Sequence, residues 1–154
     1  MKNIAILVPE SSVMQAIADP RYMFSVVNQF LQSKGQEPLF QVQLVGQSRE
    51  VRLNNGMFSV HTDRLLSEVE HADLIFIPAL FGDMQSAIDL NRSAIPWIVD
   101  QYRRGAEVAS LCVGAFLLAS TGLLDGKQCS THWAFANEFR EMFPNVELKD
   151  GSVI

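Results

Sequence analysis

The sequence predicts an α/β domain with a doubly wound, mostly parallel sheet in a three-layer α/β/α arrangement. This prediction rests on a nearly continuous apolar run at the start, on further apolar or alternating runs along the chain, and on amphipathic segments between them. Strands buried on both faces of a parallel sheet are continuously apolar, and their alternation with helices is typical of this class. The 154 residues, 48% of them hydrophobic, suit one compact domain over 1–154.

The first strand and the first helix are predicted from the amino-terminal segment. A nearly continuous apolar run at 3–8 ends at Pro9, as expected for a strand buried on both faces. Asp19 and Pro20 form a pair typical of an N-cap followed by the first helical residue, and apolar residues then recur at helical spacing up to Gly35. We therefore predict a long helix that starts at this pair.

Short extended segments follow the helix. Residues 39–45 alternate between apolar and polar side chains, which predicts a second strand nearer an edge of the sheet. The asparagine-asparagine-glycine sequence at 54–56 is typical of a hairpin turn and lies between extended pieces at 50–53 and 57–61. We expect these pieces to form a small β excursion.

Strands and helices alternate in the second half of the chain. A buried strand is predicted within 73–80, and it delivers the loop at 81–83 to the carboxyl edge of the sheet, where loops commonly line sites. Residues 94–104 place their apolar side chains on one helical face, and 107–111 form the next strand. This order fits a doubly wound sheet with right-handed crossovers.

The carboxyl end departs from the pattern. Residues 146–148 begin another strand, Asp150 and Gly151 turn the chain, and the sequence stops at Ile154 without a helix to cover that face. We therefore expect a sequence truncated from a longer protein.

Charge and cysteine content exclude several classes of function. The 12 Lys and Arg residues against 17 Asp and Glu give a net charge of −5, so this segment has no basic surplus for a DNA backbone. The two cysteines, Cys112 and Cys129, lack the spacing of a metal site, and we predict neither a metal nor a cofactor. No stretch resembles a secretion signal or a membrane span, so we expect a cytoplasmic protein with free thiols and no membrane partner.

The strongest candidate for chemistry is Cys112. A predicted strand ending at Leu111 meets an apolar helical segment at 116–119 without turn residues between them, so Cys112 lies on a sharp strand-to-helix corner. Such a corner raises the side chain above the sheet edge and directs the next backbone N–H groups, those of Val113 and Gly114, toward a bound anion. The alternative is that Cys112 is a small buried hydrophobic residue.

His132 is the second candidate. The preceding segment at 122–126 has a glycine at each end, which should return the chain toward the sheet and bring the imidazole opposite Cys112. A thiol nucleophile needs a base within hydrogen-bond reach, and a histidine at the same sheet edge would supply one. A structural or helix-capping role for His132 is equally compatible with the spacing. Ser130 or Thr131 is expected to cap the helix that follows.

The segment 108–133, V-A-S-L-C-V-G-A-F-L-L-A-S-T-G-L-L-D-G-K-Q-C-S-T-H-W, resembles the elbow region of the ThiJ/PfpI, or class I glutamine amidotransferase-like, superfamily. More narrowly, its C-x-G-A-F-L-L-A-x-x-G-L-L-D-G run followed by T-H-W is similar to the amino-terminal domains of AraC-family transcriptional regulators. The runs at 6–10 and 75–78 fit the first and central strands of the same family. The resemblance implies a flavodoxin-like fold, with Cys112 at the nucleophile-elbow position and His132 at the position of the family's neighbouring histidine.

The sequence departs from the family pattern after the first strand. Enzymatic and redox-active members place a glutamate there to hydrogen-bond the thiol, whereas the alignment puts Gln15 at this position and Glu10 too early. A neutral amide cannot supply the same proton partnership. The sequence at 78–82 likewise replaces the glycine-rich loop that is common in these families. Both features favour a pocket that binds a ligand without turning it over.

Three functional hypotheses follow. The first is a ligand-sensing, dimerising domain of an AraC-family regulator that is not an enzyme and contacts DNA only through a helix-turn-helix domain expected after residue 154. Its small, polar effector would be bound by Cys112, Val113, Gly114, His132, Gln15 and Phe81. The second is a cysteine-dependent amidase, isonitrile hydratase-like enzyme or protease, in which Cys112 and His132 would be catalytic. The third is a dimerisation domain without a ligand. We favour the first, as a homodimer.

Overall fold

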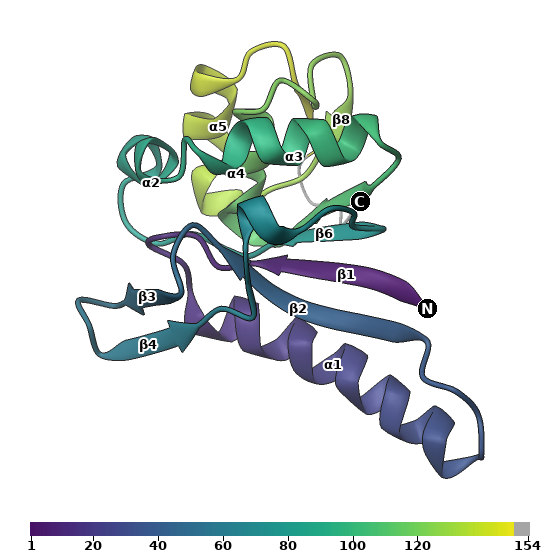
Figure 1. The fold of residues 1–154 in the computed structure, drawn as a ribbon. Helices are drawn as coiled ribbons and strands as arrows, with labels where there is room; N and C mark the ends of the chain where they lie inside the picture. Colours follow the sequence, from purple (N-terminus) through teal and green to yellow (C-terminus); the bar gives the residue numbers. More distant parts are fainter. Residues whose placement is uncertain (150–154) are drawn as a thin grey trace.

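A computed structural model describes residues 1–149 of the chain, so the predicted turn at Asp150 and Gly151 lies outside the described residues. The fold is α/β, as predicted (Figure 1). Its main sheet contains five parallel strands in the order β5-β2-β1-β6-β7. These strands are β1 (Lys2–Leu7), β2 (Phe40–Gly46), β5 (Arg64–Leu65), β6 (Leu74–Ile77) and β7 (Glu107–Ser110).

Two smaller strand pairs lie outside the main sheet. Strands β3 (Glu50–Leu53) and β4 (Phe58–His61) form an antiparallel hairpin, which confirms the predicted β excursion. The chain reverses at 54–56, where all three residues have positive φ angles of 50° to 84°, a region that asparagine and glycine tolerate. The expected last strand forms as β9 (Glu147–Leu148), but it pairs with β8 (Gln128–Cys129) and does not join the main sheet.

Helices cover both faces of the main sheet, which confirms the doubly wound arrangement. In Figure 1, α1 and the β3–β4 hairpin lie below the sheet, and the other helices lie above it. The helices are α1 (Met14–Ser33), α2 (Met84–Leu90), α3 (Ala94–Arg103), α4 (Ala115–Ala119) and α5 (Ala136–Met142). The short α2 was not predicted. None of the helices within residues 1–149 is both long and apolar enough to cross a bilayer.

The apolar first strand occupies the middle of the sheet because it contributes to two hydrophobic clusters. Successive side chains of a strand point to opposite faces. Accordingly, Ile4 and Ile6 pack into the cluster on the α1 side, and Ala5 and Leu7 pack into the cluster on the side of the other helices. This double burial explains why the run contains no polar residue between these positions.

The predicted start of the first helix is wrong, because α1 begins at Met14 and contains Pro20. The helix is anchored before its first turn by the Val13 N–H, which donates to the Ala79 carbonyl at 2.8 Å. Pro20 cannot donate to the Ala16 carbonyl, a loss that would ordinarily disfavour a helix here. Ile17 is buried in the apolar cluster on this side of the sheet and Pro20 is also buried, and this burial offsets the missing hydrogen bond.

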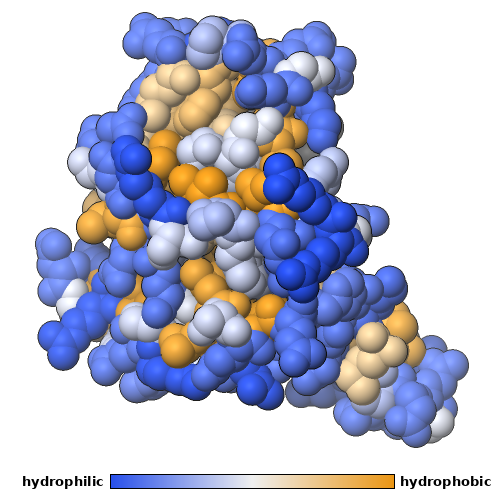
Figure 2. Space-filling view, turned by 45° about the horizontal axis from the view of Figure 1, so that its top comes forward, coloured by the Kyte–Doolittle hydropathy of each residue, from blue (hydrophilic) through white to orange (hydrophobic). Residues whose placement is uncertain are grey.

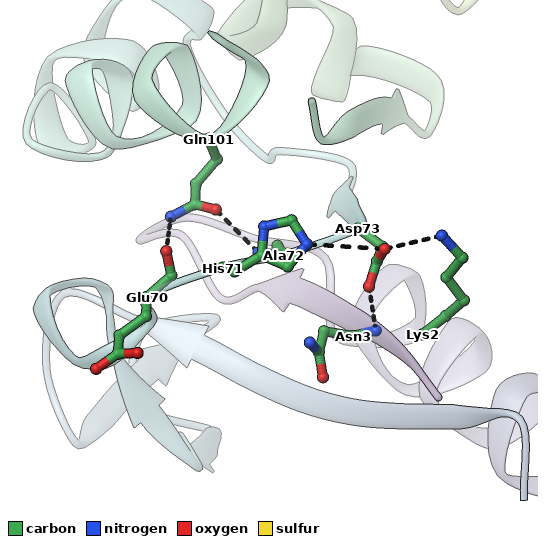
Figure 3. Close-up of polar contacts among 7 residues, drawn as sticks. All are labelled: Lys2, Asn3, Glu70, His71, Ala72, Asp73 and Gln101. Carbon is green, nitrogen blue, oxygen red and sulfur yellow. Dashed lines mark hydrogen bonds and ion pairs between the residues drawn. The ribbon is translucent and has the colours of Figure 1, made fainter. Parts of the chain in front are cut away.

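A polar network holds the amino edge of the sheet (Figure 3). The Asp73 carboxylate accepts hydrogen bonds from the Asn3 backbone N–H at 2.7 Å and from Lys2 Nζ at 2.9 Å, and His71 Nε2 lies 3.7 Å away. The Asn3 N–H, and then Lys2, lower the pKa of Asp73 from 3.8 to about 2. Behind this carboxylate, the Gln101 side chain accepts from the Ala72 N–H at 2.9 Å. The network therefore joins the starts of β1 and β6.

Asp73 is expected to make stability depend on pH in the acid range. Because its pKa is lower in the folded than in the unfolded chain, its contribution is present above pH 3.8 and is lost as pH falls toward about 2. The difference in unfolding free energy between the wild type and Asp73→Asn should therefore shrink over this interval. Urea unfolding at a series of pH values measures it, and a constant difference would contradict the assignment.

Candidate functional site

Cys112 lies at the junction between β7 and the helical segment that follows it. The strand ends at Ser110, a 3-10 turn covers Cys112–Gly114, and α4 begins at Ala115. Cys112 has a φ of +52°, an unusual conformation for a residue other than glycine, and one that is often found at functional turns. Its side chain is exposed, whereas Cys129 is buried, and this burial raises the pKa of the Cys129 thiol. Cys112 is therefore the accessible thiol of the pair.

Gly114 allows this turn to approach the end of β6. An added Cβ at Gly114 would lie 2.5 Å from the carbonyl oxygen of Pro78 and 2.8 Å from that of Ile77. These distances are too short for non-bonded carbon and oxygen atoms. The φ of Gly114 is −59°, so close packing and not backbone conformation requires glycine here. Val113 is buried beside it.

His132 caps the turn that precedes α5. Its Nδ1 accepts a hydrogen bond from the Ala134 N–H at 3.2 Å, so His132 itself caps the 3-10 turn Trp133–Phe135, and the prediction of Ser130 or Thr131 as the cap is wrong. The imidazole stacks on Trp133 with ring centroids 5.4 Å apart. Thr131 Oγ1 donates to the Cys112 carbonyl at 3.3 Å. The two segments therefore meet, but within residues 1–149 no hydrogen bond joins the Cys112 thiol to the His132 ring.

A cavity of about 730 Å³ opens at the carboxyl edge of the sheet. It is formed by the loop after β1 with the start of α1, by the β3–β4 hairpin, and by Phe81 after β6. Of the predicted ligand-binding residues, Gln15 and Phe81 line it. Cys112, Val113, Gly114 and His132 are not part of its lining. The lining residues are Glu10, Ser11, Ser12, Val13, Met14, Gln15, Arg52, Leu53, Asn54, Asn55, Gly56, Phe58 and Phe81.

The cavity lies at the topological switch point of the sheet. After β1 the chain forms α1 on one face and continues to β2, whereas after β6 it forms α2 and α3 on the opposite face and continues to β7. Because β1 and β6 are neighbours, the loops that follow them diverge and leave a crevice between their carboxyl ends. Ligands of open α/β sheets commonly bind in such crevices.

Backbone contacts fix the two loops that diverge there. The Phe81 N–H donates to the Ser11 carbonyl at 2.6 Å, and Ser12 and Leu80 form an isolated antiparallel bridge. Ser11 has a φ of +63°, a conformation that costs energy for serine. The loop after β1 is thus held in a specific, strained shape at the cavity wall.

Asn91 holds the same loop from the end of α2. It is fully buried, its Oδ1 accepts from the Glu10 N–H at 2.9 Å, and its Nδ2 donates to the Glu10 carbonyl at 2.9 Å. A further bond from Nδ2 reaches the Ala87 carbonyl at 2.7 Å, and Gln47 donates to Oδ1 at 3.1 Å. The Asn91 side chain therefore bonds to both the N–H and the carbonyl of Glu10, as the backbone of a neighbouring strand would. These bonds position one wall of the cavity.

Opposite charges line the cavity. Glu10 comes from the loop after β1, and Arg52 comes from the hairpin. The Arg52 side chain is 79% exposed, and its only ion pair within residues 1–149 is a long contact of 3.9 Å with Glu50. A guanidinium that is so weakly engaged is available to an anionic group of a ligand. No group of three or more His, Cys, Asp or Glu side chains in the described part of the chain could hold a metal ion.

Sequence reasoning did not find the hairpin wall or Asn91. The turn at 54–56 was recognised, but nothing in its sequence indicates that the hairpin folds over the carboxyl edge. Asn91 lies in a segment that was not predicted as helical, and a single asparagine between helices is common on protein surfaces. Its role is visible only once α2 and the loop after β1 are brought together.

Several curated relatives of the chain are transcriptional regulators. The chain is 30% identical over 98 residues to the HTH-type transcriptional regulator CdhR of Pseudomonas aeruginosa and 28% identical over 109 residues to the HTH-type transcriptional regulator GlxA of Rhizobium meliloti. These matches cover 64% and 71% of this chain but 28% and 33% of the relatives. The matched part is thus about a third of each relative's length.

Solved structures share the fold. A protein of Vibrio parahaemolyticus assigned to the transcriptional regulators matches with a TM-score of 0.83 at 21% identity, over 99% of this chain and 79% of that one. An AraC family transcriptional regulator from Pseudomonas putida matches with a TM-score of 0.71 at 17% identity, over 99% and 78%. At such identities the likeness establishes the fold.

Membership of a family follows from the sequence itself. The profile of the DJ-1/PfpI family matches residues 24–151, which include the central strand, the turn at Cys112 and the segment of His132. The resemblance inferred from 108–133 is confirmed, because DJ-1/PfpI and ThiJ/PfpI denote the same domain. The chain belongs to the DJ-1/PfpI family, and its curated relatives include HTH-type transcriptional regulators.

Proposed function

We propose that this chain is the ligand-sensing and dimerisation domain of an AraC-family transcriptional regulator of the cytoplasm. The names of its curated relatives support the regulatory role. With a net charge of −5, the segment itself is poorly suited to a DNA backbone. DNA would therefore be contacted by a separate helix-turn-helix domain, C-terminal to this one in the full-length regulator.

The effector is a small polar metabolite bound in the cavity at the switch point, and the position of that cavity is the observation on which the proposal depends. Its volume of about 730 Å³ falls within the range of small-molecule sites. Gln15 and the 66% exposed Phe81 offer it an amide and an aromatic face. Asn54 and Asn55 add two further amides from the hairpin.

The turn at Cys112 forms the adjoining part of the proposed site. Gly114 packs against Pro78, and the chain that follows Pro78 leads within three residues to Phe81 in the cavity wall. An effector that extends past Phe81 would approach the exposed Cys112 and the N–H of Val113, whereas the Gly114 N–H already donates to the Leu111 carbonyl at 2.8 Å.

Binding without turnover is the function favoured by the chemistry of these groups. A cysteine nucleophile needs a base or an acid that shares its proton. Gln15 is a neutral amide, and His132 Nδ1 already accepts the Ala134 N–H. The proposed domain is therefore a sensor, although Cys112 is exposed on a turn of the kind that carries nucleophiles in other folds.

A ligand screen tests this proposal. Small amines, amides and amino-acid derivatives are screened by thermal shift, and any hit is titrated calorimetrically. The hit should raise the melting temperature, be recovered unchanged, and bind at least about tenfold more weakly to Phe81→Ala and Gln15→Leu, because about 1.4 kcal/mol of contact is lost. Leu90→Ala, which changes an exposed residue of α2 outside the cavity, should bind like the wild type.

Two results would contradict the proposal. One is a ligand whose affinity is the same for the wild type and for both cavity variants, because it would bind elsewhere. The other is consumption of the ligand that stops in Cys112→Ser, which would instead identify a cysteine-dependent enzyme.

A further inference from the structure

The tip of the β3–β4 hairpin contains a chemically labile pair of residues, Asn55 followed by Gly56. Asparagine is among the thermally labile residues of proteins. The backbone nitrogen of the next residue can attack its side-chain carbon Cγ, and a glycine at that position has no Cβ to hinder the attack or restrict rotation of the backbone. Asn55 is the one asparagine in the chain that precedes a glycine. This pair is therefore the most reactive asparagine site of the sequence.

The fold leaves the pair open to water. Asn54, Asn55 and Gly56 are all exposed, and, apart from its chain neighbours, no atom lies within 4 Å of the position that a Cβ on Gly56 would occupy. In Figure 2, the left edge of the molecule, where Figure 1 places the tip of the hairpin, is mostly hydrophilic. Within residues 1–149 the Asn55 side chain makes no hydrogen bond, whereas Asn54 Nδ2 donates to Met57 Sδ at 3.4 Å. The Asn55 amide is therefore free to rotate toward the backbone.

Two backbone hydrogen bonds hold the turn and slow the reaction. The Gly56 N–H donates to the Leu53 carbonyl at 3.1 Å, and the Met57 N–H donates to the Asn54 carbonyl at 3.0 Å. The first of these bonds must break before the Gly56 nitrogen can attack. A two-stranded hairpin outside the main sheet opens at its tip far more readily than a central strand does. The turn therefore delays the attack without preventing it.

We propose that Asn55 is a site of spontaneous deamidation that remodels the hairpin wall of the cavity. A bond forms between the Gly56 nitrogen and Asn55 Cγ, the bond from Cγ to Nδ2 breaks, and the Gly56 amide proton leaves with the side-chain nitrogen as ammonia. Water then opens the resulting cyclic succinimide. Hydrolysis at Cγ gives aspartate, and hydrolysis at the main-chain carbonyl carbon gives isoaspartate, whose backbone runs through the former side chain.

Both products change the cavity that Asn55 lines. Deamidation replaces a neutral amide with a carboxylate, in a lining whose charged residues are Glu10 and Arg52, so the lining becomes net acidic. Isoaspartate also adds one carbon to the backbone between Leu53 and Phe58, which pair at the end of the hairpin and both line the cavity. The modification needs no effector, so it goes beyond the proposed function and does not depend on it.

Ageing of the ligand-free chain tests the proposal. The chain is kept in mildly alkaline buffer at physiological temperature, sampled over days and digested with trypsin, which releases residues 53–64. This peptide should acquire the mass change of NH2 to OH at Asn55. Electron-transfer fragmentation should show more isoaspartate than aspartate, as expected when both arise from one succinimide. Asn54 is the internal control, because it is equally exposed but precedes Asn55, and it should remain intact.

Gly56→Ala tests the attack by the Gly56 nitrogen. Alanine meets no steric clash at this position, but its Cβ hinders the nitrogen, so conversion of Asn55 should slow at least severalfold. The φ of Gly56 is +84°, so alanine also strains the turn, and a looser turn would speed the reaction. Slower conversion therefore cannot result from that strain. Circular dichroism establishes that the variant remains folded.

Amide hydrogen exchange tests the effect on the hairpin. The isoaspartate form is separated from the unmodified chain by ion exchange, because it carries one more negative charge. Exchange at Met57 and Phe58 should be faster in this form than in the unmodified chain. Asn55→Asp is the matched control, because it adds the same charge without lengthening the backbone, and it should exchange like the wild type at both residues.

Four results would overturn the proposal. Asn55 that stays intact in the folded chain, while the same chain unfolded in urea converts, would be fully protected by the turn. Formation of aspartate without isoaspartate would exclude the succinimide. Conversion of Gly56→Ala at the wild-type rate would exclude hindered attack by this nitrogen. Unchanged exchange at Met57 and Phe58 in the isoaspartate form would show that the hairpin wall is not remodelled.

Discussion

Replacing Gly114 with alanine is expected to destabilise the domain by about 3 kcal/mol or more. The new Cβ would lie 2.5 Å and 2.8 Å from two carbonyl oxygens at the end of β6, and neither is the end of a flexible side chain. The turn at Cys112 must therefore move away from β6, which breaks the packing of Val113 and α4 against the core. Urea unfolding of the wild type and the variant measures the loss.

Gly122→Ala is the matched control for Gly114→Ala. Gly122 has a φ of +77° and open space around its Cα, so alanine there suffers only the cost of the left-handed conformation, about 1 kcal/mol. Gly114 has an ordinary φ of −59° and suffers only the steric clash. Equal losses in the two variants would show that the close approach of the turn to β6 is not the source of the destabilisation.

Asn91→Ala is expected to cost about 3 kcal/mol as well, with a local consequence at the cavity. The substitution leaves the part-buried Glu10 N–H and carbonyl without their partner, and it also removes the buried bond to the Ala87 carbonyl. The loop after β1 should then open more often than the rest of the domain. Amide hydrogen exchange at Glu10 and Ser11 should accelerate beyond what the global loss of stability explains.

Gln101→Ala separates this local effect from general destabilisation. Gln101 is another buried amide, and it bonds to the Ala72 N–H and the Val69 carbonyl near the amino edge of the sheet, away from the cavity (Figure 3). The variant should lose comparable stability without selective exchange at Glu10. If both variants accelerate Glu10 equally, Asn91 has no particular role in shaping the cavity.

The sequence predicted the longer strands because their burial determines their local composition, whereas the two-residue strands β5 and β8 were not predicted. The run at 3–8 can be apolar throughout only if both faces are covered, and β1 indeed contributes to two clusters. The turn at 54–56 was equally readable, since asparagine and glycine tolerate the positive φ angles that all three residues adopt. In both cases the residues themselves determine the structure.

The predictions were wrong where contacts between residues far apart in the sequence determine the structure. Pro20 looks like a helix start, yet α1 begins earlier because the Val13 N–H finds the Ala79 carbonyl and Ile17 packs on the sheet. His132 was considered as a base or a cap, and only the fold shows that its Nδ1 accepts from Ala134. The cavity was expected around Cys112, but it is lined by the hairpin instead. Nothing in the sequence of β3 and β4 indicates that they lie over the carboxyl edge of the sheet.

The hairpin is not part of the main sheet, and this has a mechanical consequence. Leu53 lines the cavity on one side, and on the other it belongs to the same apolar cluster as Ile17 of α1. A tightly packed cluster transmits displacement instead of absorbing it. A ligand that displaces Leu53 therefore also displaces α1. Occupancy of the cavity and the position of α1 are thus thermodynamically linked, so a change in either one should change the other.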